Sequence, residues 1–294
     1  MKNVFLVVFV VTAFLGGGIA QLPADEPVKI KTLIIDGRFY NGEESEPALK
    51  EIYEKSGRFT VDVATTPGGR DIFRFKPDFS KYDVIVLKNY LGTRWPKETE
   101  DAFEKFVREG GGLVIVHGAN NSFHEWKEYN EMIGLGYGQG RNEKDGPYLY
   151  VKDGKVVRDT SPGSAGGHGP EMDFVVNTFK PDHPIMDGLP EAFMHSEDEL
   201  YYGLRGPANH ATILATAHSK TNEGGSGKIE PILLVIEYGK GRVFHSMLGH
   251  SDAACKCVGF QTTLFRGTEW AATNKVTIPC PDDYPTADKV SVRP

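Results

Sequence analysis

Polar residues that could do chemistry stand where short apolar segments end. His117, Asn120 and Asn121 follow the apolar run Leu113–Val116, and His250 follows a second such run near the carboxyl end of the chain. Imidazole groups act as bases, acids or metal ligands near neutral pH, and amide groups orient substrate and stabilise developing negative charge. The spacing predicts acid–base or metal-assisted chemistry at the ends of strands.

The same pattern recurs at two earlier apolar segments, over residues 30–35 and 84–87. Ligands of open α/β sheets bind beyond the carboxyl ends of the strands, where these side chains would meet. A single polar residue after a strand is typical of a turn or a helix cap, whereas four strands that all end in polar residues favour a binding site. The two earlier ends deliver Asp36, Asn41, Asn89 and Tyr90.

The stretch from His117 to Asn121 has the small residues of a nucleophile elbow, the sharp strand-to-helix turn of many α/β enzymes. The expected tip of this turn holds Ala119, which has no reactive group. Because no Ser or Cys stands there, covalent acyl transfer is disfavoured. His117, Asn120 and Asn121 are predicted to line a binding site instead.

The segment MHSEDELYY supplies the predicted acidic partners, Asp198 and Glu199, although a solvated acidic loop is the alternative. We predict His117, His250, Asp198 and Glu199 as catalytic residues. No local zinc motif occurs, so a divalent metal such as zinc would need distant ligands, with His117, His250 and Asp198 as candidates. The glycines near residues 134–140 do not follow a strand as in dinucleotide sites, so no other cofactor is expected.

The order of apolar segments indicates an α/β protein. Short apolar strands alternate with helical patterns at residues 44–56 and 96–108, which predicts a parallel sheet covered on both faces. The glycine-rich stretch 137–170 is too long for a plain connection and predicts a functional loop or lid, with a hairpin turned at Asp153-Gly154. Four further strands and a final helix at about 258–272 follow.

Composition and the chain start narrow the class of protein. The net charge of −7 includes no basic run, so nucleic acid is not an expected partner. The first residues predict a signal peptide over 1–20, with an uncleaved anchor as the alternative. The signal consists of Lys2, an apolar run over residues 4–15 and small residues up to Ala20. We therefore expect a secreted or periplasmic protein, with no later membrane span. An oxidising compartment would permit a disulfide between Cys280 and either Cys255 or Cys257.

The sequence resembles the ThuA-like family, which is linked to trehalose utilisation. The resemblance rests on LIIDGRFYN, VREGGGLVIVHGANNSFHEWKEYNEMIG, DHPIMDGLP, HSEDELYY and YGKGRVFHSMLGHS. It implies a flavodoxin-like three-layer sandwich related to class I glutamine amidotransferases, with a mostly parallel sheet and a long glycine-rich insertion. The domain would span 29–275, followed by a surface tail over 276–294. Because Ala119 stands at the expected elbow, the amidotransferase reaction is not carried over.

Two functions remain open. The first is an enzyme that catalyses hydrolysis or elimination of sugars or keto-sugars, with a separate sugar dehydrogenase in the same pathway. The second is a non-catalytic sugar-binding or scaffold protein. Either protein could form a homo-oligomer. Trp95 is a further aromatic that could stack on a sugar. The predicted substrate-binding residues are Asp36, Asn41, Asn89, Tyr90, Asn120, Asn121, Trp126 and Tyr201.

Overall fold

The structure is a computed structural model that describes residues 28–37, 46–88, 90 and 94–293. The predicted signal peptide, Asn41 and Asn89 lie outside the described residues, as does the side chain of Asp36. The predictions that concern them stay predictions.

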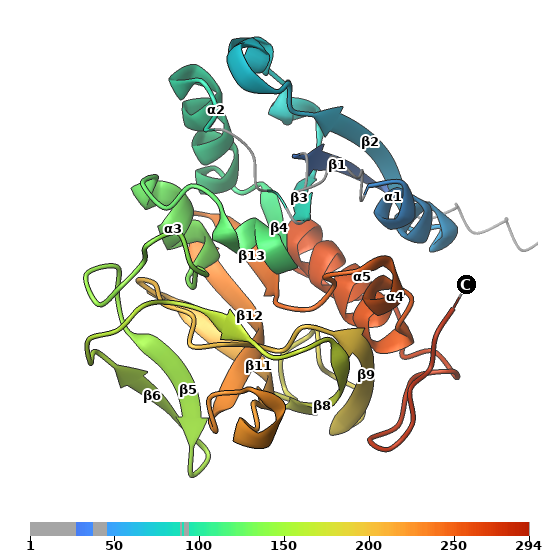
Figure 1. The fold of residues 1–294 in the computed structure, drawn as a ribbon. Helices are drawn as coiled ribbons and strands as arrows, with labels where there is room; N and C mark the ends of the chain where they lie inside the picture. Colours follow the sequence, from blue (N-terminus) through green and yellow to red (C-terminus); the bar gives the residue numbers. More distant parts are fainter. Residues whose placement is uncertain (1–27, 38–45, 89, 91–93, 294) are drawn as a thin grey trace, which may run out of the picture.

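Five parallel strands form one half of the central sheet (Figure 1). β3 and β4 are buried along their whole length, as expected for nearly uninterrupted apolar runs covered on both faces. The parallel order is β2-β1-β3-β4-β13. These strands are β1 (Ile30–Asp36), β2 (Phe59–Thr65), β3 (Val84–Lys88), β4 (Gly112–Val116) and β13 (Gly241–Ser246).

Helices cover both faces of this half, which makes three layers and is consistent with the predicted flavodoxin-like sandwich (Figure 1). α1, α4 and α5 lie on one side of β4 and β13, and α2 and α3 lie on the other. The apolar spacing correctly predicts α1, α2 and α5 to within two residues at each end. Their bounds are α1 Glu46–Lys55, α2 Lys97–Arg108, α3 Lys127–Ile133, α4 Asp252–Cys255 and α5 Val258–Thr273.

The other half of the sheet is antiparallel, which the sequence reading did not separate from the parallel half. The order continues from β13 through β12, β11 and β8 to β9. β9 was not predicted as a strand, and it carries part of the acidic motif. The bounds are β8 Met172–Thr178, β9 Ala192–Asp198, β11 Ala211–His218 and β12 Ile229–Tyr238.

Residues 137–170 contain the predicted hairpin, turned at Asp153 and Gly154, which both have positive φ. Its first strand pairs with β12 and so extends the main sheet. A second small sheet joins β7 to β10. The strands are β5 Tyr148–Lys152, β6 Lys155–Asp159, β7 Gly167–His168 and β10 Tyr201–Tyr202. A lid function for this region stays a prediction.

The segment after α5 runs over the surface with little regular structure, as predicted. It contacts the domain at two points: Met194 donates a backbone hydrogen bond to Thr286, and Cys257 bridges to Val292. All three cysteines are free, so the predicted disulfide to Cys280 is absent from the structure. In the described part of the chain, no helix has the length and apolar character needed to cross a membrane.

Candidate active site

Four neighbouring parallel strands end at one edge of the sheet, as the sequence predicts. β1, β3, β4 and β13 are adjacent and run in the same direction. Their carboxyl ends therefore meet, and His117 after β4 lies beside His250 after β13, with ring centroids 5.0 Å apart. Residues 133 positions apart in the sequence thus share one site.

His117, rather than Ala119, is the strained residue of the turn after β4. Its φ is 47°, in the left-handed region that non-glycine residues rarely adopt. A nucleophile elbow displays its reactive residue at such a strained position, directly after the strand. The expectation that Ala119 occupies the displayed position is wrong: an imidazole stands there, at the start of the 3-10 turn His117–Asn121.

The hydrogen bonds of His117 fix its tautomer. Nδ1 lies 2.7 Å from the Met247 carbonyl oxygen, which only accepts hydrogen bonds, so Nδ1 carries a proton and donates it. The Nε2 atom is fully buried and has no hydrogen-bond partner. It faces the Glu199 carboxylate, with Oε2 3.4 Å away.

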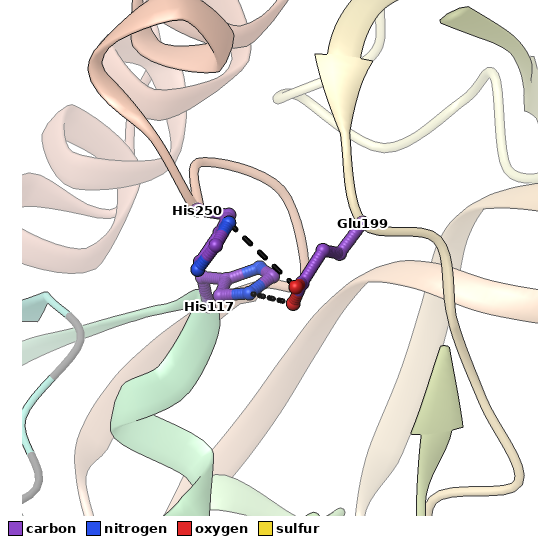
Figure 2. A group of neighbouring side chains, drawn as sticks. All are labelled: His117, Glu199 and His250. Carbon is purple, nitrogen blue, oxygen red and sulfur yellow. Dashed lines mark ion pairs between the residues drawn. The ribbon is translucent and has the colours of Figure 1, made fainter. Parts of the chain in front are cut away.

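Glu199 is the carboxylate on which the histidines converge (Figure 2). Besides His117, its carboxylate lies 3.4 Å from Nδ1 of His168 and 3.8 Å from Nδ1 of His250. Burial alone would raise the pKa of Glu199, but the nearby histidines, His117 first, outweigh it and lower the pKa. Glu199 is therefore ionised at neutral pH.

Two residues from the segment around β7 complete the outer side of the site. His168 lies beside Glu199, and the carboxylate of Glu171 lies 2.9 Å from Nδ1 of His250. The sequence reading placed His168 only on the supposed lid and did not single out Glu171. A two-residue strand leaves no periodic signal, so its pairing with β10 could not be read from the sequence.

Exposure rises in one direction across the site. The side chain of His117 is 1% exposed, that of Glu199 15%, and that of His250 23%. His168 and Glu171 are 36% and 48% exposed. Solvent therefore reaches the cluster from the β7 side, while the Nε2 atom of His117 forms its innermost point.

Asp198 does not face this cluster. It is completely buried, with Oδ2 2.7 Å from Nε2 of His195 and accepting a hydrogen bond from the Gly249 amide, at 2.6 Å. Its other oxygen accepts from the amides of His250 and Glu199, at 3.1 and 2.9 Å. Asp198 therefore holds two residues of the cluster through their backbones, and its predicted role as a catalytic residue or metal ligand is corrected.

The buried partner of Asp198 is a histidine. Burial would lower the pKa of His195, but the Asp198 carboxylate and the Cys257 thiol outweigh that effect and raise the pKa to about 9. The same pairing lowers the pKa of Asp198 against the effect of burial. Both groups are charged at neutral pH, which leaves the oxygens of Asp198 as strong acceptors for the surrounding amides.

The asparagines of the turn are placed differently from the prediction. The Asn120 Nδ2 group donates to Nε2 of His245, at 3.1 Å, while Nδ1 of His245 donates to the Ile133 carbonyl. One of the two amide hydrogens of Asn120 is thus used within the core. Asn121 is partly buried, and its Oδ1 atom has no hydrogen-bond partner.

The aromatic residues predicted to contact sugar are mostly in the core. Tyr90, Trp126 and Trp95 are 0%, 3% and 4% exposed. Trp95 also donates its indole hydrogen to the Tyr90 hydroxyl. These three rings cannot stack on a ligand in this structure. Tyr201 does lie in the site, but its ring packs against His117, 4.1 Å between centroids.

The sequence matches the ThuA family, described as trehalose utilisation, over residues 31–271. The chain belongs to the ThuA family. A solved ThuA-like protein from Parabacteroides merdae is 46% identical, with a TM-score of 0.88, and the match covers 90% of this chain and 98% of that one. The family predicted from the sequence motifs is confirmed.

A more distant ThuA-like structure, from Bacteroides uniformis, shares the fold. It is 17% identical, with a TM-score of 0.54, over 87% of this chain and 98% of that chain. Among functionally curated proteins, none matches the sequence. The comparisons therefore establish the family and fold of this ThuA protein, and its activity has to be argued from the site.

Proposed function

We propose that this ThuA protein is an enzyme of carbohydrate breakdown, acting on sugars or keto-sugars by acid–base or metal-assisted hydrolysis or elimination. The observation that carries the proposal is the convergence of His117, His250 and Glu199 at the carboxyl edge of the sheet. The family description, trehalose utilisation, supports a carbohydrate substrate. The predicted leader over residues 1–20 supports action outside the cytoplasm.

The cluster contains the groups that such a reaction needs. Hydrolysis and elimination both require one group that takes a proton and another that gives one. Glu199 is ionised and so has the oxygens to accept a proton, while the more exposed His168 and Glu171 lie where a leaving group could be protonated. The strained position after β4 carries an imidazole, which fits proton transfer or ligation better than acyl transfer.

The competing function is a non-catalytic sugar-binding protein, favoured by the lack of Ser or Cys in the turn after β4. Purified mature protein incubated with disaccharides and their 3-keto forms, followed by chromatography, separates the two. We expect turnover, and we expect His117→Ala and His250→Ala each to lower kcat by about 100-fold or more. His218→Ala, which changes an exposed histidine outside the cluster, is the control.

Binding of a sugar by the wild-type protein without turnover of any of these compounds would establish the binding function instead. Equal loss of turnover in His218→Ala would show that the effect comes from a general disturbance of the fold.

A further inference from the structure

We infer that His117, Glu199 and His250 bind one divalent transition-metal ion, an inference that rests on the proposed function only for the role of the ion. Each residue offers a ligand atom, and the three atoms lie within 4.8 Å of one another. Two histidines and one carboxylate form the donor set of catalytic zinc sites and of non-haem iron sites. The three residues come from the ends of β4, β9 and β13 (Figure 2).

The separation of the donor atoms fits a shared ion. Ligands about 2.0–2.1 Å from a tetrahedral zinc ion stand about 3.3 Å from each other. Nε2 of His117 and Oε2 of Glu199 are 3.4 Å apart. A direct N–H···O hydrogen bond would bring them to about 2.7–3.2 Å. The observed distance is longer and matches the spacing of two ligands on one ion.

The tautomer of His117 gives an independent argument. Because Nδ1 donates to the Met247 carbonyl, Nε2 is the nitrogen of His117 that faces the Glu199 carboxylate, 3.4 Å away. Nε2 is buried there and has no hydrogen-bond partner. A metal ion held by Nε2 and the carboxylate would give both atoms a partner.

The neighbouring groups are those that usually support metal ligands. A ligating histidine commonly donates its second ring nitrogen to a backbone carbonyl or a carboxylate, which fixes its orientation. Met247 provides the carbonyl for His117, and Glu171 provides the carboxylate for Nδ1 of His250.

Three protein ligands leave at least one coordination position for water or a substrate oxygen. A bound zinc ion lowers the pKa of its water to about 7 and polarises a carbonyl oxygen. The outward side, lined by His168 and Glu171, is where this position would open, because exposure rises in that direction. The substrate class this suits is a sugar with a carbonyl or hydroxyl oxygen that can reach the ion.

Zinc titration of the chelator-stripped mature protein tests the inference directly. We expect one Zn²⁺ per chain with a Kd below about 1 µM by calorimetry. His117→Ala, His250→Ala and Glu199→Gln should each weaken binding by at least about 100-fold, and Glu171→Gln by about 10- to 100-fold. The matched controls are His218→Ala and Glu197→Gln, the latter two residues from Glu199, and both should bind as wild type does.

Circular dichroism of each variant checks that it is folded. Absence of wild-type binding at about 1 mM Zn²⁺ overturns the inference, as does binding that all three ligand variants retain. Zinc binding without turnover of any sugar would uphold the metal site and reject the proposed function. Full turnover by stripped protein would uphold the proposed function and reject a role for the ion in the reaction.

Discussion

At the scale of single residues, a one-position difference decides which carboxylate serves the site. Asp198 and Glu199 are neighbours in the sequence, yet Asp198 is directed into the core and Glu199 toward the histidines. Composition and spacing predicted the acidic pair but could not choose between its members. The choice depends on the register of β9, since a shift by one residue exchanges the faces of a strand.

Asp198 should be important for stability. Asp198→Ala would leave His195 buried without its carboxylate partner, and would remove the acceptor of three backbone amides. We expect a loss of about 3–5 kcal/mol in the free energy of unfolding, measured by urea denaturation. The control is Asp173→Ala, since Asp173 is exposed and accepts one amide. A loss below about 1 kcal/mol for Asp198→Ala would contradict this role.

At the scale of elements, the parallel strands were predictable and the antiparallel ones were not. β3 and β4 are uninterrupted apolar runs, so their burial and the meeting of their ends followed from the sequence. β9 contains His195, Ser196 and Asp198, buried polar residues that resemble a solvated loop in sequence. Tyr90 and Trp126 were misplaced because an aromatic residue in a loop near a strand end suits the core and a binding site equally well.

The turn after β13 should require glycine at residue 249. Gly249 has a φ of 101°, and an added Cβ would lie 2.7 Å from the Phe260 ring. Gly249→Ala should therefore destabilise the protein and, by moving His250, weaken Zn²⁺ binding. Gly57→Ala is the matched control: its φ is 71°, but nothing lies near the added Cβ.

Both glycine variants carry the backbone cost of a left-handed residue, about 1–2 kcal/mol. Only Gly249→Ala should lose more than this in urea denaturation and change the zinc titration. Equal losses in the two variants would mean that the contact with Phe260 is unimportant.

At the scale of the whole molecule, a partly buried histidine, His183, should make stability fall in acid. Burial is the largest effect on His183 and lowers its pKa to about 4, and Nδ1 of its neutral ring accepts a hydrogen bond from the Ile185 amide. In the unfolded chain the pKa is about 6.5. The unfolded state therefore binds the proton first, and stability falls as the pH drops from about 6.5 to about 4.

His183→Asn keeps an acceptor near the position of Nδ1 but does not titrate. The free energy of unfolding of this variant should fall less than that of wild type between these pH values. Urea denaturation at several pH values between these limits gives both slopes. Parallel curves for the two proteins would show that His183 does not contribute.

The imidazole displayed after β4 also determines which reagents can reach this protein. Electrophilic probes that label serine and cysteine enzymes react with an activated hydroxyl or thiol, and the turn His117–Asn121 presents neither. Cys255 and Cys257 are buried as well. Selective inhibitors should therefore be reversible chelating molecules that imitate a sugar, and activity-based profiling with covalent warheads should leave the protein unlabelled at its centre.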